Sequence, residues 1–350
     1  MIPAGGAGTR LWPRSRRRRP KHTLSLSGSG KPLLQETQER IQPLAQEVYV
    51  LTEAAQIPVI REILPALDED RLIVEPSARG TTNALGLAAL TLLDRDPEAV
   101  MFSLASDHVI RGVAAYRRAV REAVAVAETT GCLVTVGLKP RFPATGFGYI
   151  RAGAEVRVGR RRAFRVAEFV EKPDLERARA YVESGEYHWN LNTFCWRASS
   201  FIEELERWAP DHARGLRRAV RARRQGREQE VARIYNRLPV AAVDYSVMER
   251  TDRLLLVPAS FEWADVGSWA DLHAMSRHDG RGNVVAGEHV LIDTDSSLFY
   301  APGKLVAAIG VSELVVVDSP DALLVMPRSR TQDVKKVVEK LGRAGKFEYL

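Results

Sequence analysis

Apolar runs and amphipathic stretches alternate through the first 140 residues. Short apolar runs predict strands at 48–51, 72–74, 100–105 and 132–137. Between them, apolar residues recurring every three or four positions predict helices at 32–41, 58–67, 81–93 and 116–129. Strands that alternate with helices in this way form βαβ units. The pattern therefore predicts an α/β fold, a Rossmann-like mixed and mostly parallel sheet with helices on both faces.

The pattern changes twice further along the chain. Strands at 147–151, 164–170 and 193–197 surround a predicted helix at 175–184, and 199–237 reads as consecutive helices. Beyond 282, short β-rich runs separated by Gly, Asp, Ser and Pro precede a predicted helix at 332–341. The polar stretch around Gly280 predicts a boundary between two domains. We expect a catalytic domain over 1–278 and a small β-rich domain over 279–350.

The stretch 3–21, PAGGAGTRLWPRSRRRRPK, brings three glycines and several cations into one short loop. Gly5, Gly6 and Gly8 allow positive φ and close approach of backbone N–H groups to phosphate oxygens, while Arg10 and Lys21 supply positive charge. Neither the P-loop nor the G-x-G-x-x-G dinucleotide fingerprint fits the spacing. A glycine-rich turn that opens a helix is the simpler alternative. We interpret the loop as a polyphosphate site, which points to phosphoryl or nucleotidyl transfer.

Two aspartates follow predicted strands far apart in the chain. Asp107 comes after the run 100–105, and Asp265 lies between two tryptophans. Ligands of open α/β sheets bind at the carboxyl ends of strands, so both carboxylates could meet the glycine loop in one crevice. Mg²⁺ is typically held by one or two carboxylates plus substrate phosphates. An aspartate at a strand end can equally be a helix cap or a turn former.

Composition narrows the class of protein. Lys and Arg outnumber Asp and Glu by 51 to 44, a basic balance that would suit a nucleic-acid partner. Much of the excess lies in 14–19, which a highly anionic small substrate explains, and in 207–237, which a solvated helix face explains, so we expect no nucleic-acid partner. The two cysteines lie in apolar runs, and no apolar run approaches the ~20 residues of a membrane helix. We therefore expect a cytoplasmic enzyme with no membrane partner. Only three residues precede the loop, which is short for a central strand, so we expect further residues upstream.

Five motifs carry a resemblance to a known family. The loop GGAGTRLWPRSRRRRPK resembles the signature of sugar-nucleotide pyrophosphorylases, in particular the mannose-1-phosphate guanylyltransferase branch. FVEKP at 169–173, WN at 189–190, VDYSVMER at 243–250 and WADVGSW at 263–269 follow in the family's order. The resemblance covers nearly the whole chain. It implies GTP and mannose 1-phosphate as substrates, Mg²⁺ as cofactor, GDP-mannose and pyrophosphate as products, and a β-helix-like C-terminal domain that could form a homodimer.

The resemblance also implies roles for individual residues. It assigns catalysis to Arg10, Lys21 and Lys172, and metal binding to Asp107 and Asp265. It assigns nucleotide binding to Ala4, Gly5, Gly6, Gly8, Thr9, Arg10, Arg79 and Thr81. It assigns binding of the sugar phosphate to Gly148, Glu171, Lys172 and Asn190. Trp12, unlike the other tryptophans, is expected to have a functional role on the same ground.

Two departures from the family pattern leave the substrate open. Asn192 replaces a small residue near the sugar, and Gly80 stands in a turn where the family usually has Asn. A nucleotidyltransferase for another hexose 1-phosphate or another base is therefore an alternative. A catalytically silent paralogue that binds a nucleotide sugar and regulates a partner is a second alternative. The silent paralogue is disfavoured, since binding alone does not need both metal ligands and this chain keeps the whole set Arg10, Lys21, Asp107, Lys172 and Asp265.

Overall fold

A three-stranded parallel sheet positions the glycine loop in the computed structural model, which describes residues 1–6 and 8–350. Its strands, in spatial order, are β1 (Ile2–Pro3), β2 (Val50–Glu53) and β3 (Leu72–Glu75). Helices α1 (Leu33–Ile41) and α2 (Ile57–Ile63) lie between them in the chain. The amino nitrogen of Met1 donates to the carbonyl of Phe102 at 2.8 Å, and its carbonyl accepts from the amide of Leu104 at 3.2 Å. These bonds join β1 to the second sheet.

The second sheet has six strands in the order β4-β9-β6-β10-β8-β7. They are β4 (Val100–Ser103), β9 (Tyr187–Arg197), β6 (Leu133–Leu138), β10 (Leu254–Ala259), β8 (Arg161–Val170) and β7 (Tyr149–Val158). β6 and β10 pair in parallel, whereas the other pairings in this sheet are antiparallel. The mixed α/β class is confirmed, but the expectation of a mostly parallel sheet is wrong here. The reason is that two strands run in the opposite direction: β9 lies antiparallel between β4 and β6, and β8 returns from β7 as a hairpin with no crossover helix.

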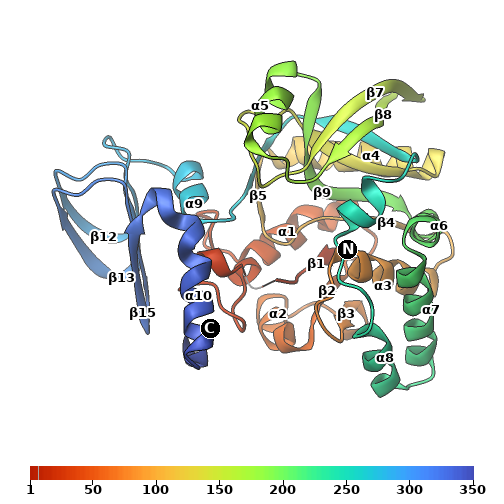
Figure 1. The fold of residues 1–350 in the computed structure, drawn as a ribbon, viewed down its shortest axis with the longest axis horizontal. Helices are drawn as coiled ribbons and strands as arrows, with labels where there is room; N and C mark the ends of the chain where they lie inside the picture. The colour runs from red at the N-terminus through yellow and green to blue at the C-terminus, as the bar shows by residue number, and fades with distance from the viewer. Residues whose placement is uncertain (7) are drawn as a thin grey trace.

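Helices cover both faces of this sheet (Figure 1). Alternating side chains of the strands divide the core accordingly. On β10, Leu254 and Leu256 pack into the core cluster that contains α3 (Thr81–Leu93), α6 (Ala198–Trp208) and α7 (Pro210–Arg224). Leu255 and Val257 pack into the opposite cluster, with α4 (Val113–Thr130). Successive side chains of a strand point to opposite faces, which produces this division. Helix α5 (Leu175–Ser184) precedes β9, and α8 (Glu228–Tyr235) follows α7.

The C-terminal part is a separate β-rich unit, seen in blue in Figure 1. Its strands are β12 (Val284–Ile292), β13 (Leu298–Ile309), β14 (Leu314–Ser319) and β15 (Ala322–Pro327). β12, β13 and β14 pair in parallel, as successive coils of a β-helix do, and β15 returns antiparallel. Helices α9 (Trp269–Met275) and α10 (Val334–Arg343) flank the unit, and the pattern analysis missed α9. The expectation of a C-terminal β-helix-like domain is confirmed.

The C-terminal unit packs against the flank of the glycine loop. The indole N–H of Trp12 donates to the carbonyl of Tyr349 at 2.8 Å, and the indole of Trp269 donates to the carbonyl of Trp12 at 3.1 Å. Arg16 donates to both carboxylate oxygens of Asp321, at 2.6 and 2.7 Å. Trp12 is 7% exposed and belongs to the core shared by the two units. The structure therefore gives Trp12 a packing role, and its expected role in function stays a prediction.

No helix among the described residues is both long enough and apolar enough to cross a bilayer.

Candidate active site

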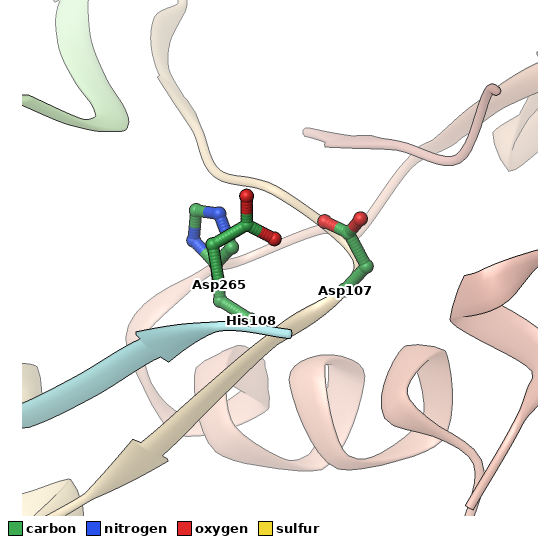
Figure 2. A group of neighbouring side chains, drawn as sticks. All are labelled: Asp107, His108 and Asp265. Carbon is green, nitrogen blue, oxygen red and sulfur yellow. The ribbon is translucent and has the colours of Figure 1, made fainter. Parts of the chain in front are cut away.

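A short antiparallel ribbon brings the two predicted metal ligands together. Strand β5 (His108–Arg111) pairs with β11 (Glu262–Asp265), and Asp265 lies opposite His108 in the register. Asp107 directly precedes β5, so its carboxylate lies beside that of Asp265 (Figure 2). Potential ligand atoms of Asp107, His108 and Asp265 all lie within 4.8 Å of one another. The carboxylates meet as expected, although an antiparallel ribbon rather than parallel strand ends brings them together.

The ammonium group of Lys21 binds both carboxylates. It lies 2.8 Å from Oδ2 of Asp107 and forms an ion pair with Oδ1 of Asp265, and the Lys21 side chain is 7% exposed. Burial alone would lower the pKa of Lys21, but the two carboxylates outweigh burial and raise it. Burial likewise opposes ionisation of Asp107, yet the attraction of the Lys21 ammonium lowers its pKa to about 2. This buried cluster is therefore charged at neutral pH.

His108 is a site residue that sequence reasoning missed. The indole N–H of Trp263 donates to Nδ1 of His108 at 3.1 Å. Burial lowers the pKa of His108, with Lys21 and Arg40 acting in the same direction, so the ring is neutral. A neutral ring that accepts at Nδ1 carries its proton on Nε2 and is a donor there. The oxygen ligands that suit Mg²⁺ are thus those of Asp107 and Asp265.

The glycine loop lies directly against Lys21. Gly8 has φ of 60°, and a Cβ atom at this position would lie 2.6 Å from Cβ of Lys21. Only glycine fits there without displacing the lysine. A Cβ on Gly267, in the turn after Asp265, would lie 3.6 Å from Nη1 of Arg10. Loop, lysine and the turn after Asp265 therefore converge on one place.

The remaining predicted nucleotide-binding residues of the loop differ in exposure. Ala4 is buried and its amide donates to the carbonyl of Leu51 at 2.7 Å, which anchors the start of the loop on β2. Gly5, Gly6 and Thr9 are exposed. Their exposure leaves the surface of the loop accessible.

Arg79 and Thr81 flank a turn that the chain itself packs tightly. Gly80 has φ of 80°, and a Cβ here would lie 2.2 Å from the carbonyl oxygen of Ala241. The hydroxyl of Thr81 accepts from the amide of Val243 at 2.9 Å. The close approach of residues 239–243 thus explains the glycine that departs from the family pattern. No contact links Arg79 or Thr81 to the acidic cluster among the described residues.

The four residues predicted to bind the sugar phosphate lie together. A Cβ on Gly148 would lie 2.4 Å from Oε2 of Glu171 and 3.0 Å from Cβ of Asn190, so a glycine is needed for the close packing. Oε1 of Glu171 pairs with the ammonium of Lys172 at 2.6 Å. Oε2 of Glu171 is buried and has no hydrogen-bond partner in the part of the chain that the structure describes. A buried carboxylate oxygen left in this way is a ready acceptor for a ligand hydroxyl.

Asp244 is a second residue that the sequence analysis missed. Nδ2 of Asn190 donates to its Oδ1 at 3.0 Å. Burial, reinforced by the negative charge of Glu171, raises the pKa of Asp244 to about 7. Asp244 begins a π-helical turn, Asp244–Met248, a form often found at functional sites. The motif VDYSVMER contained the signal, but nothing in its spacing indicated burial.

Aromatic rings connect the acidic cluster to the sugar-phosphate cluster. The ring of Trp263, which binds His108, lies 4.8 Å from that of Phe147. Phe147 in turn lies 5.4 Å from Trp189, the neighbour of Asn190 in sequence. The carbonyl of Phe147 also accepts from the amide of Lys172 at 3.2 Å. The two clusters therefore belong to one continuous region.

Comparisons with known proteins agree with this arrangement. Residues 1–282 match the nucleotidyl transferase family, and residues 287–341 match the mannose phosphate isomerase/GMP-like β-helix domain. A mannose-1-phosphate guanylyltransferase of Escherichia coli K12 is 42% identical over the whole chain, which covers 74% of that protein. A second, ManC of Salmonella typhimurium LT2, is 40% identical with the same coverage.

Solved structures show the same relationship. The crystal structure of a protein named mannose-1-phosphate geranyltransferase, from Thermus thermophilus, superposes with a TM-score of 0.87 at 35% identity. The match covers 97% of this chain and 98% of that one. The chain therefore belongs to the nucleotidyl transferase family. Within that family it is an enzyme of the mannose-1-phosphate guanylyltransferase group.

Proposed function

We propose that the enzyme transfers GMP from GTP to α-D-mannose 1-phosphate, giving GDP-mannose and pyrophosphate. The observation that carries this proposal is the convergence of Lys21, Asp107 and Asp265 beside the glycine loop, with Glu171 and Lys172 in the connected cluster. The first group suits a metal-bound triphosphate, and the second suits a phosphorylated sugar.

In the proposed reaction a phosphate oxygen of the sugar phosphate attacks the α-phosphorus of GTP. A bond forms to that oxygen while the bond from the α-phosphorus to the pyrophosphate oxygen breaks. A phosphate monoester with a second pKa of about 6 is mostly ionised at neutral pH, so no general base is required. The protein has to align two anions and stabilise the charge on the leaving pyrophosphate.

The residues fit these tasks. Asp107 and Asp265 would hold Mg²⁺, which would supply charge neutralisation at the reacting phosphates. Lys21 and Arg10 would bind the triphosphate, with the exposed glycines of the loop donating backbone N–H groups. Lys172 would bind the phosphate of the sugar, and Glu171 would accept hydrogen bonds from its hydroxyls. Arg79 and Thr81, which follow β3, would contribute to binding the nucleotide.

Lys21 must change partners in this scheme. Its ammonium now lies between the two carboxylates, where it balances their charge. With Asp107 and Asp265 holding a divalent cation, the ammonium of Lys21 would be free to bind the phosphates. This exchange links metal binding to the placement of a catalytic cation.

The names of the relatives support guanylyl and mannose over other bases and sugars. The test is pyrophosphate release with Mg²⁺ across ATP, CTP, GTP and UTP, each with mannose, glucose and galactose 1-phosphates. We expect GTP with mannose 1-phosphate to give the highest kcat/KM. Preference for another pair would support the alternative nucleotidyltransferase, and no turnover with any pair would support the silent paralogue.

Three further expectations remain proposals. The chain divides into a catalytic domain over 1–278 and a C-terminal domain over 279–350. The C-terminal domain forms a homodimer contact. The enzyme works in the cytoplasm, in keeping with two cysteines, Cys132 and Cys195, that are free thiols.

A further inference from the structure

Asn192 occupies an irregular point of β9, next to the sugar-phosphate cluster. Phe194 pairs with Thr135 and Asn190 pairs with Gly137, so residues 191–193 lie opposite the single residue 136. A bulge of this kind redirects a side chain out of the strand. Asn192 has φ of 50°, in the left-handed region that asparagine adopts more readily than most residues. Its side chain is exposed, unlike those of its neighbours in β9.

Asn190 holds the amide group of Asn192 in one orientation. Nδ2 of Asn190 donates to Oδ1 of Asn192 and to Oδ1 of Asp244, both at 3.0 Å. Oδ1 of Asn190 accepts from the backbone N–H of Asn192 at 3.2 Å and from the hydroxyl of Thr135 at 3.4 Å. All the hydrogen-bonding positions of the Asn190 side chain are thus used inside the protein. Asn190 acts as a support, and it could bind a sugar only by giving up one of these bonds.

The Nδ2 group of Asn192 is differently placed. The side-chain oxygen of Asn192 is fixed by Asn190, whereas Nδ2 of Asn192 donates no hydrogen bond among residues 1–6 and 8–350. In the same cluster, Oε2 of Glu171 is a buried acceptor with no described partner. Gly148, Glu171, Asn190 and Asn192 are linked by successive close contacts. The cluster therefore presents one amide donor and one carboxylate acceptor.

A hexose ring matches this pair, because each of its hydroxyls can both donate and accept. We propose that Nδ2 of Asn192 donates a hydrogen bond to a ring hydroxyl of the sugar 1-phosphate and so determines sugar specificity. The inference rests on the proposed function and deepens it. It assigns the contact to Asn192, the residue that departs from the family pattern, and leaves Asn190 as its support.

The test compares the wild type with Asn192→Gly, using mannose 1-phosphate and its monodeoxy analogues. Glycine accepts the backbone conformation of Asn192, so the fold should persist. We expect the variant to raise the KM for mannose 1-phosphate about tenfold, as loss of one hydrogen bond does, with kcat and the KM for GTP changed less than about twofold. One deoxy analogue should have a KM with the wild type that is raised by a similar factor relative to mannose 1-phosphate. With the variant, the same analogue and mannose 1-phosphate should have equal KM values. An unchanged KM, or penalties that add for every analogue, would overturn the inference.

Asn192→Asp is the matched control for a purely supporting role. It keeps the oxygen that accepts from Asn190 but puts a carboxylate oxygen in place of the amide donor, beside the carboxylate of Glu171 and facing a hydroxyl that Glu171 also needs as a donor. We therefore expect a raised KM for mannose 1-phosphate and a changed discrimination among the analogues. Wild-type discrimination among the analogues in this variant would show that Asn192 only supports Asn190. A failure of the proposed function would appear in the wild type, as absent turnover with mannose 1-phosphate. If the wild type shows no turnover, wild type and Asn192→Gly are compared by calorimetric titration with the sugar 1-phosphates. Equal Kd values for the two proteins would overturn the inference.

Discussion

At the scale of single residues, Lys21 decides the electrostatics of the site. Two carboxylates that lie this close repel each other, and the buried ammonium between them removes that repulsion. The same position would be taken by a divalent cation. Lysine and metal should therefore compete for Asp107 and Asp265.

This competition predicts the behaviour of Lys21→Ala. Without its ammonium, the carboxylates should bind Mg²⁺ more tightly, so Mg²⁺ should raise the melting temperature more than in the wild type. Turnover should nevertheless fall at least 100-fold, because the triphosphate loses a charged ligand. Thermal melts with and without Mg²⁺, together with steady-state kinetics, measure both effects.

Lys172→Ala provides the comparison for that experiment. It removes the same charge from a cluster that holds neither Asp107 nor Asp265, so its response to Mg²⁺ in the melts should equal that of the wild type. An equal response in Lys21→Ala would contradict the proposed competition.

Asp244 predicts a pH dependence of stability. The folded protein raises its pKa from 3.8 to about 7, so the folded state holds this proton more tightly than the unfolded chain does. The contribution of Asp244 to stability is therefore greatest below about pH 4 and declines as the pH rises to about 7. Asp244→Asn should remove this decline and raise stability at pH 8 relative to the wild type, by roughly 1–3 kcal/mol. Denaturant unfolding at pH 5 and pH 8 checks the sign, and a variant less stable than the wild type at pH 8 would refute it.

Residue types predicted part of the site and not its internal bonding. Asp107, Asp265 and Lys21 could be chosen from the sequence because their chemistry fits a metal and a phosphate. His108 could not be chosen, because its tautomer depends on Trp263, far along the chain. Asp244 was missed for a similar reason, since burial rather than spacing gives it an unusual pKa.

At the scale of elements, the glycine loop and the β5–β11 ribbon meet through Lys21. Gly8 has the tightest fit in the loop, with a positive φ and the side chain of Lys21 at the position of a missing Cβ. The loop therefore sets the position of the lysine as well as presenting its backbone to a ligand.

Gly8→Ala tests this steric coupling. The added methyl group should displace Lys21 and impose a left-handed conformation on alanine, at a cost of about 1–3 kcal/mol. We expect kcat/KM to fall at least tenfold while circular dichroism shows a folded protein. Gly280→Ala is the matched control, since nothing lies within 4 Å of its missing Cβ and its φ is not positive. Equal activities of the two variants would show that Gly8 does not position Lys21.

The elements themselves were predictable where hydrophobic periodicity was strong. Helices α3 and α5 begin and end where the pattern placed them, and β6 is shifted by one residue at each end. The ribbon of β5 and β11 escaped prediction because its strands are short and mixed in polarity. Pairing direction in the larger sheet also could not be read locally, because antiparallel partners such as β4 and β9 lie far apart in sequence.

At the scale of the whole molecule, the C-terminal unit has two faces. One packs on the glycine-loop flank through Trp12 and Arg16. Another carries apolar side chains that are about half exposed or more, on β12, β13 and β15: Val290, Ile292, Leu305, Ile309, Leu323 and Val325. Of these, Ile292 lies directly opposite Ile309 in the register. Exposed apolar side chains that lie together mark association surfaces, which supports the proposed homodimer.

Ile309→Glu tests the homodimer. It places a charge where the side chain is 69% exposed, so the monomer should fold while association weakens. Light scattering after size-exclusion chromatography should give a dimer mass for the wild type and a monomer mass for the variant. Val240→Glu, a similarly exposed position on the catalytic side, should remain a dimer. A monomeric wild type would contradict the proposal.

The proposed reaction requires Asp107 and Asp265 to hold a divalent cation at the triphosphate. A crystal grown with Mn²⁺ and a non-hydrolysable GTP analogue tests it through anomalous scattering. We predict a manganese peak bound by both carboxylates and by phosphate oxygens, with the ammonium of Lys21 moved onto the phosphates. A peak elsewhere, or a Lys21 that still joins the two carboxylates with the nucleotide bound, would contradict the account.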